Sequence, residues 1–578
     1  MPNPNDFIPA WCEQEAPAGS WRSLFKYGDP KGFKHPNRGL YRLVKESFHM
    51  SDEDFQKPSL KMEIINNDIP SHLAGKHLSA LRRMVSADNL HLDTYTRLRA
   101  SYGAGMLDAL RLRNEIIENI PEAVLWPRDQ ADIEKIVAYC DKQHIPLYIY
   151  GGGSTVTRGM EAVNGGISLD MSVHMNKVVA FNEVNHTIAV QAGMWGPQLE
   201  EILNNAPTTL EASRSYTLGH FPQSFEHSSV GGWVVTRGAG QNSTYYGKIE
   251  DMVIAQEYVT PIGIFKTKEY PRAATGPDFD QVMMGSEGTF GVLTSVTLRI
   301  CHYDPAHTRR FSYIFKDWTE AREACREIMQ GEFGYPSVFR LSDPEETDVA
   351  MRTYHIHDTI ADQFLHSRGY QPMQRCLLLG SVDGDTDFSR LVQRKLHRIC
   401  KKHGAFTLTP FRITQAWEKS RFTDPFLRED LMDHGIMIDT LECAVNWAQM
   451  GGVHQQVRAL VKNRPNTICM THLSHAYPQG ANLYFIFIAR ITDINEYLTL
   501  QYGILEAIQQ AGAAISHHHG VGKQTAPWLE ENIGKPAVDV VRILRDHFDP
   551  HHIMNPGGTL GLDMNAEQKK KKWGFRKK

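Results

Sequence analysis

Four loops of glycine and small polar residues lie between residues 151 and 291, and they constrain the fold of this chain more than any other feature. The first, Gly151-Gly-Gly-Ser-Thr155, follows a predicted strand at 146–150, which is itself preceded by a predicted helix at 129–139 and a short strand at 124–127. Glycine adopts positive φ without steric cost, so such a loop can turn several backbone N–H groups toward an anion. Its spacing fits neither the GxGxxG turn of a Rossmann fold nor a P-loop, and we expect neither.

The three later loops belong to the same region of short β-rich runs. They are Ser228-Ser-Val-Gly-Gly232, Thr236-Arg-Gly-Ala-Gly240 and Gly285-Ser-Glu-Gly-Thr-Phe-Gly291. All of them offer backbone N–H donors, and most add a hydroxyl group. Together the four loops suit one large ligand that combines a pyrophosphate, a ribityl chain and a flat ring.

Composition and cysteine spacing exclude several classes of protein. The 578 residues exceed what one hydrophobic core supports, and a net charge of −4 gives no global field that would recruit nucleic acid. None of the 8 cysteines forms a CxxC pair, so we expect reduced thiols rather than a zinc site, an iron–sulfur cluster or a redox dithiol. We find no secretory signal and no apolar run of ~20 residues, and we expect a cytoplasmic protein.

The end of the chain is basic: seven of the residues 569–578 are Lys or Arg. A solvated terminus is the favoured interpretation of this segment. The alternative is transient contact with an anionic membrane surface, with Trp573 and Phe575 entering the interface.

The loops and the segment Leu125-Trp-Pro127, in this order, resemble the FAD-binding domain of the vanillyl-alcohol oxidase / p-cresol methylhydroxylase superfamily. The resemblance implies that the first loop wraps the pyrophosphate and that the later ones hold the ribityl chain, the adenine and the isoalloxazine. Some members attach the flavin through a histidine in the first loop, where this chain has Ser154-Thr155, so we expect non-covalent FAD and no metal. The residues expected to bind FAD are Ile149, Tyr150, Gly151, Gly152, Gly153, Ser154, Thr155, Gln223, Ser224, Phe225, Glu226, His227, Ser228, Ser229, Thr236, Arg237, Gly238, Ala239, Gly285, Ser286, Glu287, Gly288, Thr289, Phe290 and Gly291.

The resemblance also implies a fold of class α+β with two lobes. We expect a helical N-terminal extension at 1–118 and a two-subdomain FAD-binding domain at 119–300. An α+β cap that presents the substrate follows at 301–545, then a return to the FAD domain at 546–565 and the basic tail at 566–578.

Within the superfamily the chain resembles the alkyldihydroxyacetonephosphate synthases, through the segments 219–224, 226–233, 338–343 and 483–485 and through Ile515-Ser-His-His-His-Gly-Val-Gly522. These flavoenzymes of ether lipid synthesis exchange the acyl group of acyl-dihydroxyacetone phosphate for a fatty alcohol through a flavin N5 adduct. The resemblance implies lipid substrates, and we expect a homodimer that binds no nucleic acid.

By the same resemblance Tyr484 is the proton donor and acceptor, and His517, His518 and His519 supply a basic cluster. Arg340 and His220 are then expected near flavin and substrate. Histidine, with an unperturbed pKa of ~6.5, can donate or accept a proton at neutral pH. The residue pattern alone leaves other interpretations open: Tyr484 sits in an apolar strand typical of a core tyrosine, and Arg340 could pair with Asp343 on the surface.

One position departs from the synthases, which carry a substrate-binding arginine twelve residues before the tyrosine. Here that position is His472, which we expect to bind substrate with at most one pH-dependent charge. The departure favours an alternative function, an FAD-dependent D-2-hydroxyacid (lactate or glycolate type) dehydrogenase or oxidase. In that case His472, His475 and Glu442 could hold a divalent metal, although we favour a site without metal. A non-catalytic flavoprotein is the second alternative.

Overall fold

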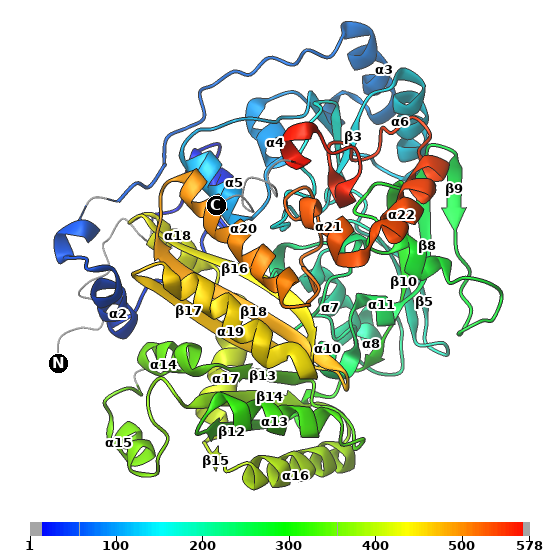
Figure 1. Ribbon diagram of the computed structural model, residues 1–578. Helices are drawn as coiled ribbons and strands as arrows, with labels where there is room; N and C mark the ends of the chain where they lie inside the picture. The colour runs from blue at the N-terminus through cyan, green and yellow to red at the C-terminus, as the bar shows by residue number, and fades with distance from the viewer. Residues whose placement is uncertain (1–13, 57, 355, 570–578) are drawn as a thin grey trace.

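The computed structural model describes residues 14–56, 58–354 and 356–569, and its strands form a pair of sheets on one side and a large sheet on the other (Figure 1). The basic segment from 570 onward lies outside the described residues. No helix in the described ranges has both the length and the apolar character needed to cross a membrane.

The predicted strand–helix–strand unit before the first glycine loop is confirmed. Helix α6 (Gln130–Gln143) begins at Asp129, whose side chain accepts a hydrogen bond from the backbone N–H of Asp132, as an N-cap should. Its Ile133, Ile136 and Val137 are buried against the neighbouring sheet. That sheet has the order β1-β2-β4-β3, with β2, β4 and β3 parallel. Its strands are β1 (Leu90–His91), β2 (Ala123–Leu125), β3 (Leu147–Tyr150) and β4 (Ile167–Asp170).

A second, antiparallel sheet of five strands completes this side, in the order β5-β6-β10-β8-β9. Its strands are β5 (Val178–Asn182), β6 (Thr187–Gln191), β8 (Val253–Thr260), β9 (Gly263–Lys266) and β10 (Val292–Arg299). A two-stranded ribbon of β7 (Tyr216–Thr217) and β11 (Cys301–His302) follows. The first glycine loop follows β3, the second leads into α9 (Val230–Thr236), the third follows α9, and the fourth lies between α12 (Phe279–Met283) and β10. Helix α7 (Gly196–Asn204) lies between β6 and β7.

The N-terminal region contains several helices, and it also supplies a strand that the sequence analysis missed. Residues Leu90 and His91 of β1 pair antiparallel with Leu125 and Val124 of β2, so this segment is part of the FAD-side sheet. Two residues are too few to produce an alternating pattern. The helices of this region are α1 (Trp21–Phe25), α2 (Arg38–Phe48), α3 (Gly75–Val85), α4 (Thr94–Arg99) and α5 (Met106–Arg113).

The large sheet has seven strands in the order β15-β12-β14-β13-β17-β18-β16, all paired antiparallel. Helices α19 and α20 cover the end formed by β16–β18, and Figure 1 shows both lying across these strands. Its strands are β12 (Arg309–Phe315), β13 (Val338–Ser342), β14 (Cys376–Val382), β15 (Phe406–Thr407), β16 (Ile436–Asn446), β17 (Thr467–Ser474) and β18 (Gly480–Arg490). The helices beside it are α13 (Trp318–Met329), α14 (Pro344–Thr353), α15 (Ile360–Ser367), α16 (Thr386–Lys402), α17 (Pro410–Ser420), α18 (Phe426–Met432), α19 (Trp447–Asn463) and α20 (Ile494–Gln510).

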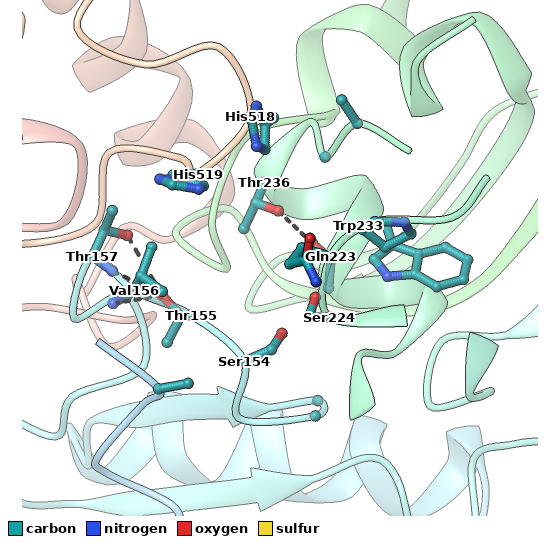
Figure 2. Close-up of a pocket in the computed structure, with 18 of the residues that line it drawn as sticks. Ser154, Thr155, Val156, Thr157, Gln223, Ser224, Trp233, Thr236, His518 and His519 are labelled. Atoms are coloured by element: carbon teal, nitrogen blue, oxygen red, sulfur yellow. Dashed lines mark hydrogen bonds between the residues drawn. The ribbon is translucent and has the colours of Figure 1, made fainter. Parts of the chain in front are cut away.

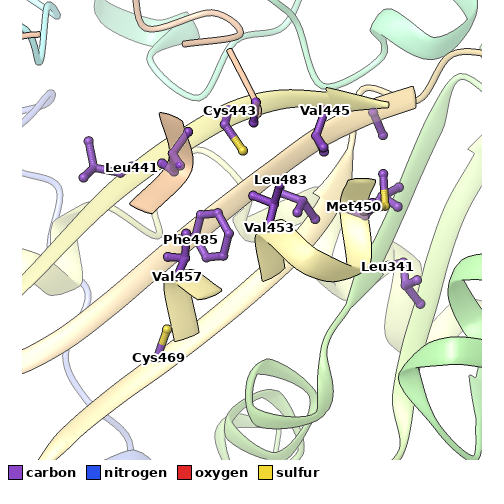
Figure 3. Packing of buried hydrophobic residues seen from close by; sticks show 14 of the residues in the cluster. Leu341, Leu441, Cys443, Val445, Met450, Val453, Val457, Cys469, Leu483 and Phe485 are labelled. Atoms are coloured by element: carbon purple, nitrogen blue, oxygen red, sulfur yellow. The ribbon is translucent and has the colours of Figure 1, made fainter. Parts of the chain in front are cut away.

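The core under α19 fixes which face of this sheet is free. Leu483 and Phe485 of β18 are completely buried and pack against Val453 and Val457 of α19 (Figure 3). Since side chains of a strand alternate between faces, Tyr484 and Ile486 must point away from this core. The sheet therefore presents one row of side chains to the FAD side.

The chain returns to the first sheet near its C-terminus, after α21 (Ala526–Ile533) and α22 (Lys535–Phe548). The backbone N–H of Leu147 donates to the carbonyl of Ile553 at 2.8 Å, and the N–H of Asn555 donates to the carbonyl of Leu147 at 2.8 Å. These bonds place Asn555 beside the first glycine loop.

Candidate active site

A cavity of about 410 Å³ lies between the glycine loops and the free face of the large sheet, within the size range of cofactor and ligand sites. Figure 2 shows Ser154, Thr155, Gln223 and Ser224 in the part formed by the loops, and His518 and His519 on a separate loop across from them. The cavity thus brings together residues more than 350 positions apart in the sequence.

The glycines of the first loop are required by close backbone packing. A Cβ at Gly151 would lie 2.4 Å from Ser229 Oγ, and one at Gly152 would lie 2.4 Å from the carbonyl oxygen of His227. Gly153 has φ +70°, where side chains are strained. The first loop therefore has no room for larger side chains at these positions, and the buried Oε1 of Gln241, which also lines the cavity, has no hydrogen-bond partner among the described residues. Both observations fit a large polar ligand such as FAD.

Most of the loop residues expected to bind FAD line this cavity. They are Ile149, Gly151, Gly152, Gly153, Ser154, Thr155, Gln223, Ser224, Ser229, Thr236, Gly238, Ala239, Glu287, Gly288 and Gly291.

The other expected residues do not line the cavity, and most of their side chains make contacts inside the protein. The Tyr150 hydroxyl accepts a hydrogen bond from Arg99 Nε, and Ser228 Oγ accepts one from the indole N–H of Trp233. The guanidinium of Arg237 donates to the side-chain oxygen of Gln281. The remaining ones are Phe225 and Phe290 in the core, Gly285 beside Arg237, Thr289 bonded to the Ser286 carbonyl, His227 against Tyr27, the buried Ser286 and the exposed Glu226. A sequence motif alone does not distinguish the side chains that face the ligand from those that hold the loop in place.

Three polar residues form a row across the free face of the large sheet. Glu442 of β16 is paired with Tyr484 of β18, and Tyr484 is paired with His472 of β17. Residues directly opposite one another share a face, so the strand register places these three side chains side by side. The neighbouring row, Cys443–Leu483–Leu473, points into the core.

Tyr484 faces the cavity and is not a core tyrosine. Its hydroxyl donates to Thr440 Oγ1 at 3.1 Å, and its ring stacks on His472 at 4.8 Å between centroids. The ring of His518 is also nearly parallel to the ring of Tyr484, with 6.0 Å between the two centroids. Burial raises the pKa of Tyr484 to about 12, so the free protein holds the phenol protonated at neutral pH.

His472 is held in a closed polar triad with Arg340 and Glu346. Arg340 Nη1 lies 3.1 Å from His472 Nε2 and Nη2 lies 2.5 Å from Glu346 Oε1, which also lies 3.1 Å from His472 Nδ1. Burial and the charge of Arg340 lower the pKa of His472. Burial opposes ionisation of Glu346, but the positive charge of Arg340 and the contact with His472 bring its pKa down to about 2. His472 is therefore a neutral imidazole here.

The suggested pairing of Arg340 with Asp343 is wrong. Asp343 caps α14 by accepting the N–H of Glu346, and its other oxygen lies 3.0 Å from His454 Nε2 and 2.9 Å from Arg458 Nη1. Arg340 instead lines the cavity beside His472.

The triple-histidine loop is organised around the carboxylate of Glu442. The backbone N–H groups of His517, His518 and His519 donate to it at 2.6, 3.1 and 3.0 Å. Ser516 Oγ and Asn482 Nδ2 add two further bonds, at 2.8 and 3.1 Å. Burial penalises the charge, but the nearby histidines and these backbone donors hold the pKa of Glu442 at about 2.

The three histidine side chains have different environments. His518 and His519 line the cavity, whereas His517 lies behind them with Nε2 2.8 Å from the hydroxyl of Tyr477. Burial lowers the pKa of all three, so they are neutral proton acceptors. The expected cluster is thus assembled, but only two of its members reach the ligand space.

The far end of the same loop is tied to the FAD side by Glu287. Its carboxylate accepts the N–H groups of Val521 and Gly522 at 2.6 and 2.7 Å, and burial raises its pKa to about 7. Asn555 Nδ2 donates to the Glu287 carbonyl at 2.7 Å, and the buried Lys523 donates to Asn555 Oδ1 at 2.7 Å. The histidine loop is therefore held by one carboxylate from each side of the cavity.

His220 does not line the cavity, contrary to the expectation that it lies near flavin and substrate. It is completely buried, its ring lies 4.7 Å from that of Trp233, and neither ring nitrogen has a hydrogen-bond partner among the described residues. Burial lowers its pKa to about 3. Trp233 lines the cavity, so His220 supports the wall from behind.

The sequence analysis missed an arginine that lines the cavity, Arg428 of α18. Its Nη1 donates to the carbonyl of Ala104 at 2.7 Å, and its buried Nε has no partner among the described residues. Asp439, whose pKa burial raises to about 6, lies in the same region of the cavity. One arginine in a charge-rich helical segment gives no sequence signal that would have identified it.

The residues proposed for a metal in the alternative function are used otherwise. His475 Nδ1 lies 2.6 Å from Ser243 Oγ, and His472 belongs to the triad above. Glu442, His517 and His518 do bring one potential ligand atom each within 4.8 Å of one another. Both oxygens of Glu442 already accept backbone N–H groups, which fits a structural anchor better than a metal ligand.

Comparisons with known proteins agree with this site. Residues 121–267 match the family described as FAD binding domain, and residues 304–559 match the C-terminal domain of FAD linked oxidases. An alkyldihydroxyacetonephosphate synthase of Dictyostelium discoideum is 28% identical over 87% of this chain and 83% of its own length. One from Trypanosoma brucei brucei is 26% identical over 91% of this chain and 88% of its own length. A solved structure titled alkyldihydroxyacetonephosphate synthase superposes with a TM-score of 0.78 at 25% identity, covering 92% of this chain and 98% of that one. The chain therefore resembles the alkyldihydroxyacetonephosphate synthases over most of its length, and its matches to the FAD binding domain and to the FAD linked oxidases indicate FAD as its cofactor.

Proposed function

We propose that this protein exchanges the acyl group of acyl-dihydroxyacetone phosphate for a fatty alcohol, forming an ether bond. The observation that carries the proposal is the meeting of Tyr484, His518 and His519 with the glycine loops around one cavity. A binding module without chemistry has no use for three convergent proton-transfer groups. A D-2-hydroxyacid oxidation is less well supported, because the histidines it would need for a metal are engaged elsewhere.

FAD would be held without a covalent bond by the loop residues that line the cavity, from Ile149 to Thr155 and around Ser229, Thr236 and Gly288. When bound, it supplies the reactive ring at which the two substrates are exchanged. Ser154 and Thr155 can donate hydroxyl hydrogen bonds to its anionic part, as can the backbone N–H groups beside them.

The anionic head group of the substrate would bind Arg428. This arginine has a buried Nε free to donate, and a guanidinium offers phosphate a charged, planar set of donors. Arg340 is committed to Glu346 and His472, and His472 is neutral. The charge that the sequence analysis assigned to position 472 is therefore proposed to come from position 428.

The long chains of both substrates would lie along the apolar part of the wall. Val338, Phe339, Trp417, Ile438 and Ile486 all line the cavity next to the polar row. Burying each methylene of a fatty chain there contributes about 0.8 kcal/mol.

Proton transfer would be divided between Tyr484 and the two histidines. The exchange requires a proton to leave the substrate carbon beside a carbonyl and another to leave the alcohol. A neutral His518 or His519 can accept either proton, and the protonated Tyr484 can donate one to the departing carboxylate.

The visible spectrum of the purified holoprotein under anaerobic conditions tests the proposal. Acyl-dihydroxyacetone phosphate should change the spectrum without any electron acceptor, and a fatty alcohol should reverse the change. Lasting bleaching by a D-2-hydroxyacid, restored only by an acceptor, would instead establish the dehydrogenase function.

We also propose a homodimer and transient contact of the basic segment 569–578 with anionic membranes. The support for membrane contact is the charge of that segment together with a lipid substrate. Co-sedimentation with anionic liposomes, with and without the segment, tests this contact, and analytical ultracentrifugation tests the dimer.

A further inference from the structure

We propose that His518, His517 and Tyr477 form a proton path from the cavity to the protein surface. The inference rests on the proposed function, which produces a proton that must leave. In that reaction an ester C–O bond breaks, an ether C–O bond forms, the acid departs as a carboxylate, and the hydroxyl proton of the alcohol is released.

The path consists of two short contacts between ring nitrogens and a hydroxyl. His518 lines the cavity, and its Nδ1 lies 3.0 Å from His517 Nδ1. On the other side of the same imidazole, His517 Nε2 lies 2.8 Å from the hydroxyl of Tyr477. An imidazole accepts a proton on one nitrogen and releases one from the other, so this geometry can pass a proton through His517 without moving the ring.

Burial changes along the path in the order that a route to the surface requires. His517 is only 8% exposed and does not line the cavity, so neither substrate nor cofactor accounts for its position. Tyr477 is half-buried in the turn between β17 and β18, where it exchanges backbone hydrogen bonds with Gly480. Its hydroxyl therefore links the buried His517 to a residue that is itself partly exposed.

The charges around His517 keep it a neutral relay. Lys248 Nζ donates to the His517 carbonyl at 2.8 Å, and Glu442 binds its N–H at 2.6 Å. Lys248, His475 and His518 disfavour the imidazolium, which Glu442 favours, and burial lowers the pKa of His517 well below its ordinary value. A proton would thus pass on rather than rest there.

Acidic groups at the outer end favour the release of the proton. Glu250 pairs with Lys248 at 3.1 Å, and its side chain is one-fifth exposed. Burial raises the pKa of Tyr477, and the charges of Glu250 and the adjacent Asp251 raise it further. Tyr477 therefore acts through its neutral hydroxyl, donating one proton as it accepts another.

The test is Tyr477→Phe in the holoprotein, which removes only the hydroxyl. We expect kcat for acyl–alkyl exchange to fall at least tenfold in a weakly buffering medium, with KM and FAD content unchanged. Imidazole at tens of millimolar should restore the rate, because a small buffer can carry the proton instead. Tyr245→Phe removes a hydroxyl from an exposed tyrosine outside the path and should keep the full rate.

A Tyr477→Phe enzyme with the wild-type rate, or a loss that no buffer restores, would overturn the path. ¹⁵N-histidine NMR of the holoprotein gives a second readout that needs no turnover. It should show that Tyr477→Phe shifts the Nε2 resonance of His517, and an unaltered resonance would also overturn the path. A wild-type protein that fails the exchange assay but shows this NMR shift would count against the proposed function and not against the contact.

Discussion

Replacing Glu442 with glutamine examines the finding that one buried carboxylate fixes the triple-histidine loop. Glutamine keeps the volume and one acceptor oxygen, but its amide nitrogen cannot accept a hydrogen bond. With the amide oxygen toward Ser516, His518 and His519, the N–H of His517 and the amide of Asn482 lose their acceptor. Each buried donor left without a partner costs about 1–3 kcal/mol, so we expect the two together to lower the free energy of unfolding by about 2–6 kcal/mol.

The pH dependence of the free energy of unfolding measures the contribution of Glu442 in a second way. Lowering the pKa of Glu442 from 4.5 to about 2 corresponds to about 3 kcal/mol. A carboxyl with a depressed pKa stabilises the fold above its unfolded-state pKa, and this contribution disappears as the pH falls from about 4.5 to about 2. Glu442→Gln should therefore be less stable than the wild type at pH 7, and the difference should shrink in that acidic window.

Denaturant unfolding of the two holoproteins, followed by circular dichroism at several pH values, measures these changes. Glu530→Gln, on the exposed end of α21, is the matched control and should match the wild type. The exchange rate should also fall in Glu442→Gln, because His518 and His519 lose their fixed backbone. Equal midpoints and equal rates for Glu442→Gln and the wild type would refute the anchoring role.

Three further changes test other parts of the site. Tyr484→Phe should lower kcat about 10²–10⁴-fold while leaving the flavin spectrum intact, which steady-state kinetics and absorbance at 450 nm would show. Arg428→Met should raise KM for acyl-dihydroxyacetone phosphate by roughly 10–100-fold, since a charged hydrogen bond contributes about 1.5–3 kcal/mol, and FAD content should not change. Gly152→Ala should yield protein depleted of FAD, because its Cβ would lie 2.4 Å from the carbonyl oxygen of His227, and the ratio of flavin to protein absorbance measures this loss.

The local elements could be predicted from the sequence where a short pattern determines them. The cap at Asp129 and the strand before Gly151 each follow from neighbouring residues, whereas the uniformly apolar run around Tyr484 does not show which face the tyrosine occupies. The glycine loops could be assigned to one ligand because four of them cannot all be incidental turns. The chemistry of the site was therefore accessible without a structure.

The features of the site that the sequence did not predict depend on contacts between distant segments. The Glu442 anchor joins β16 to a loop 75 positions later, and Arg428 reaches the cavity only because α18 packs under β16. The state of His472 depends on Arg340, which lies on the strand paired beside it, and on Glu346 of α14. The burial of His220 behind Trp233 is likewise a property of the packed core, and a motif gives no information about it.

The most direct test of the proposed exchange is a product measurement in the absence of any electron acceptor. Purified holoprotein would be incubated anaerobically with acyl-dihydroxyacetone phosphate and a deuterated fatty alcohol, and the products would be followed by mass spectrometry. We predict that the intact deuterated chain appears in an ether product, with one fatty acid released for each ether formed. Absence of the ether from a protein that carries FAD, together with oxidation of a D-2-hydroxyacid on addition of an acceptor, would contradict the account.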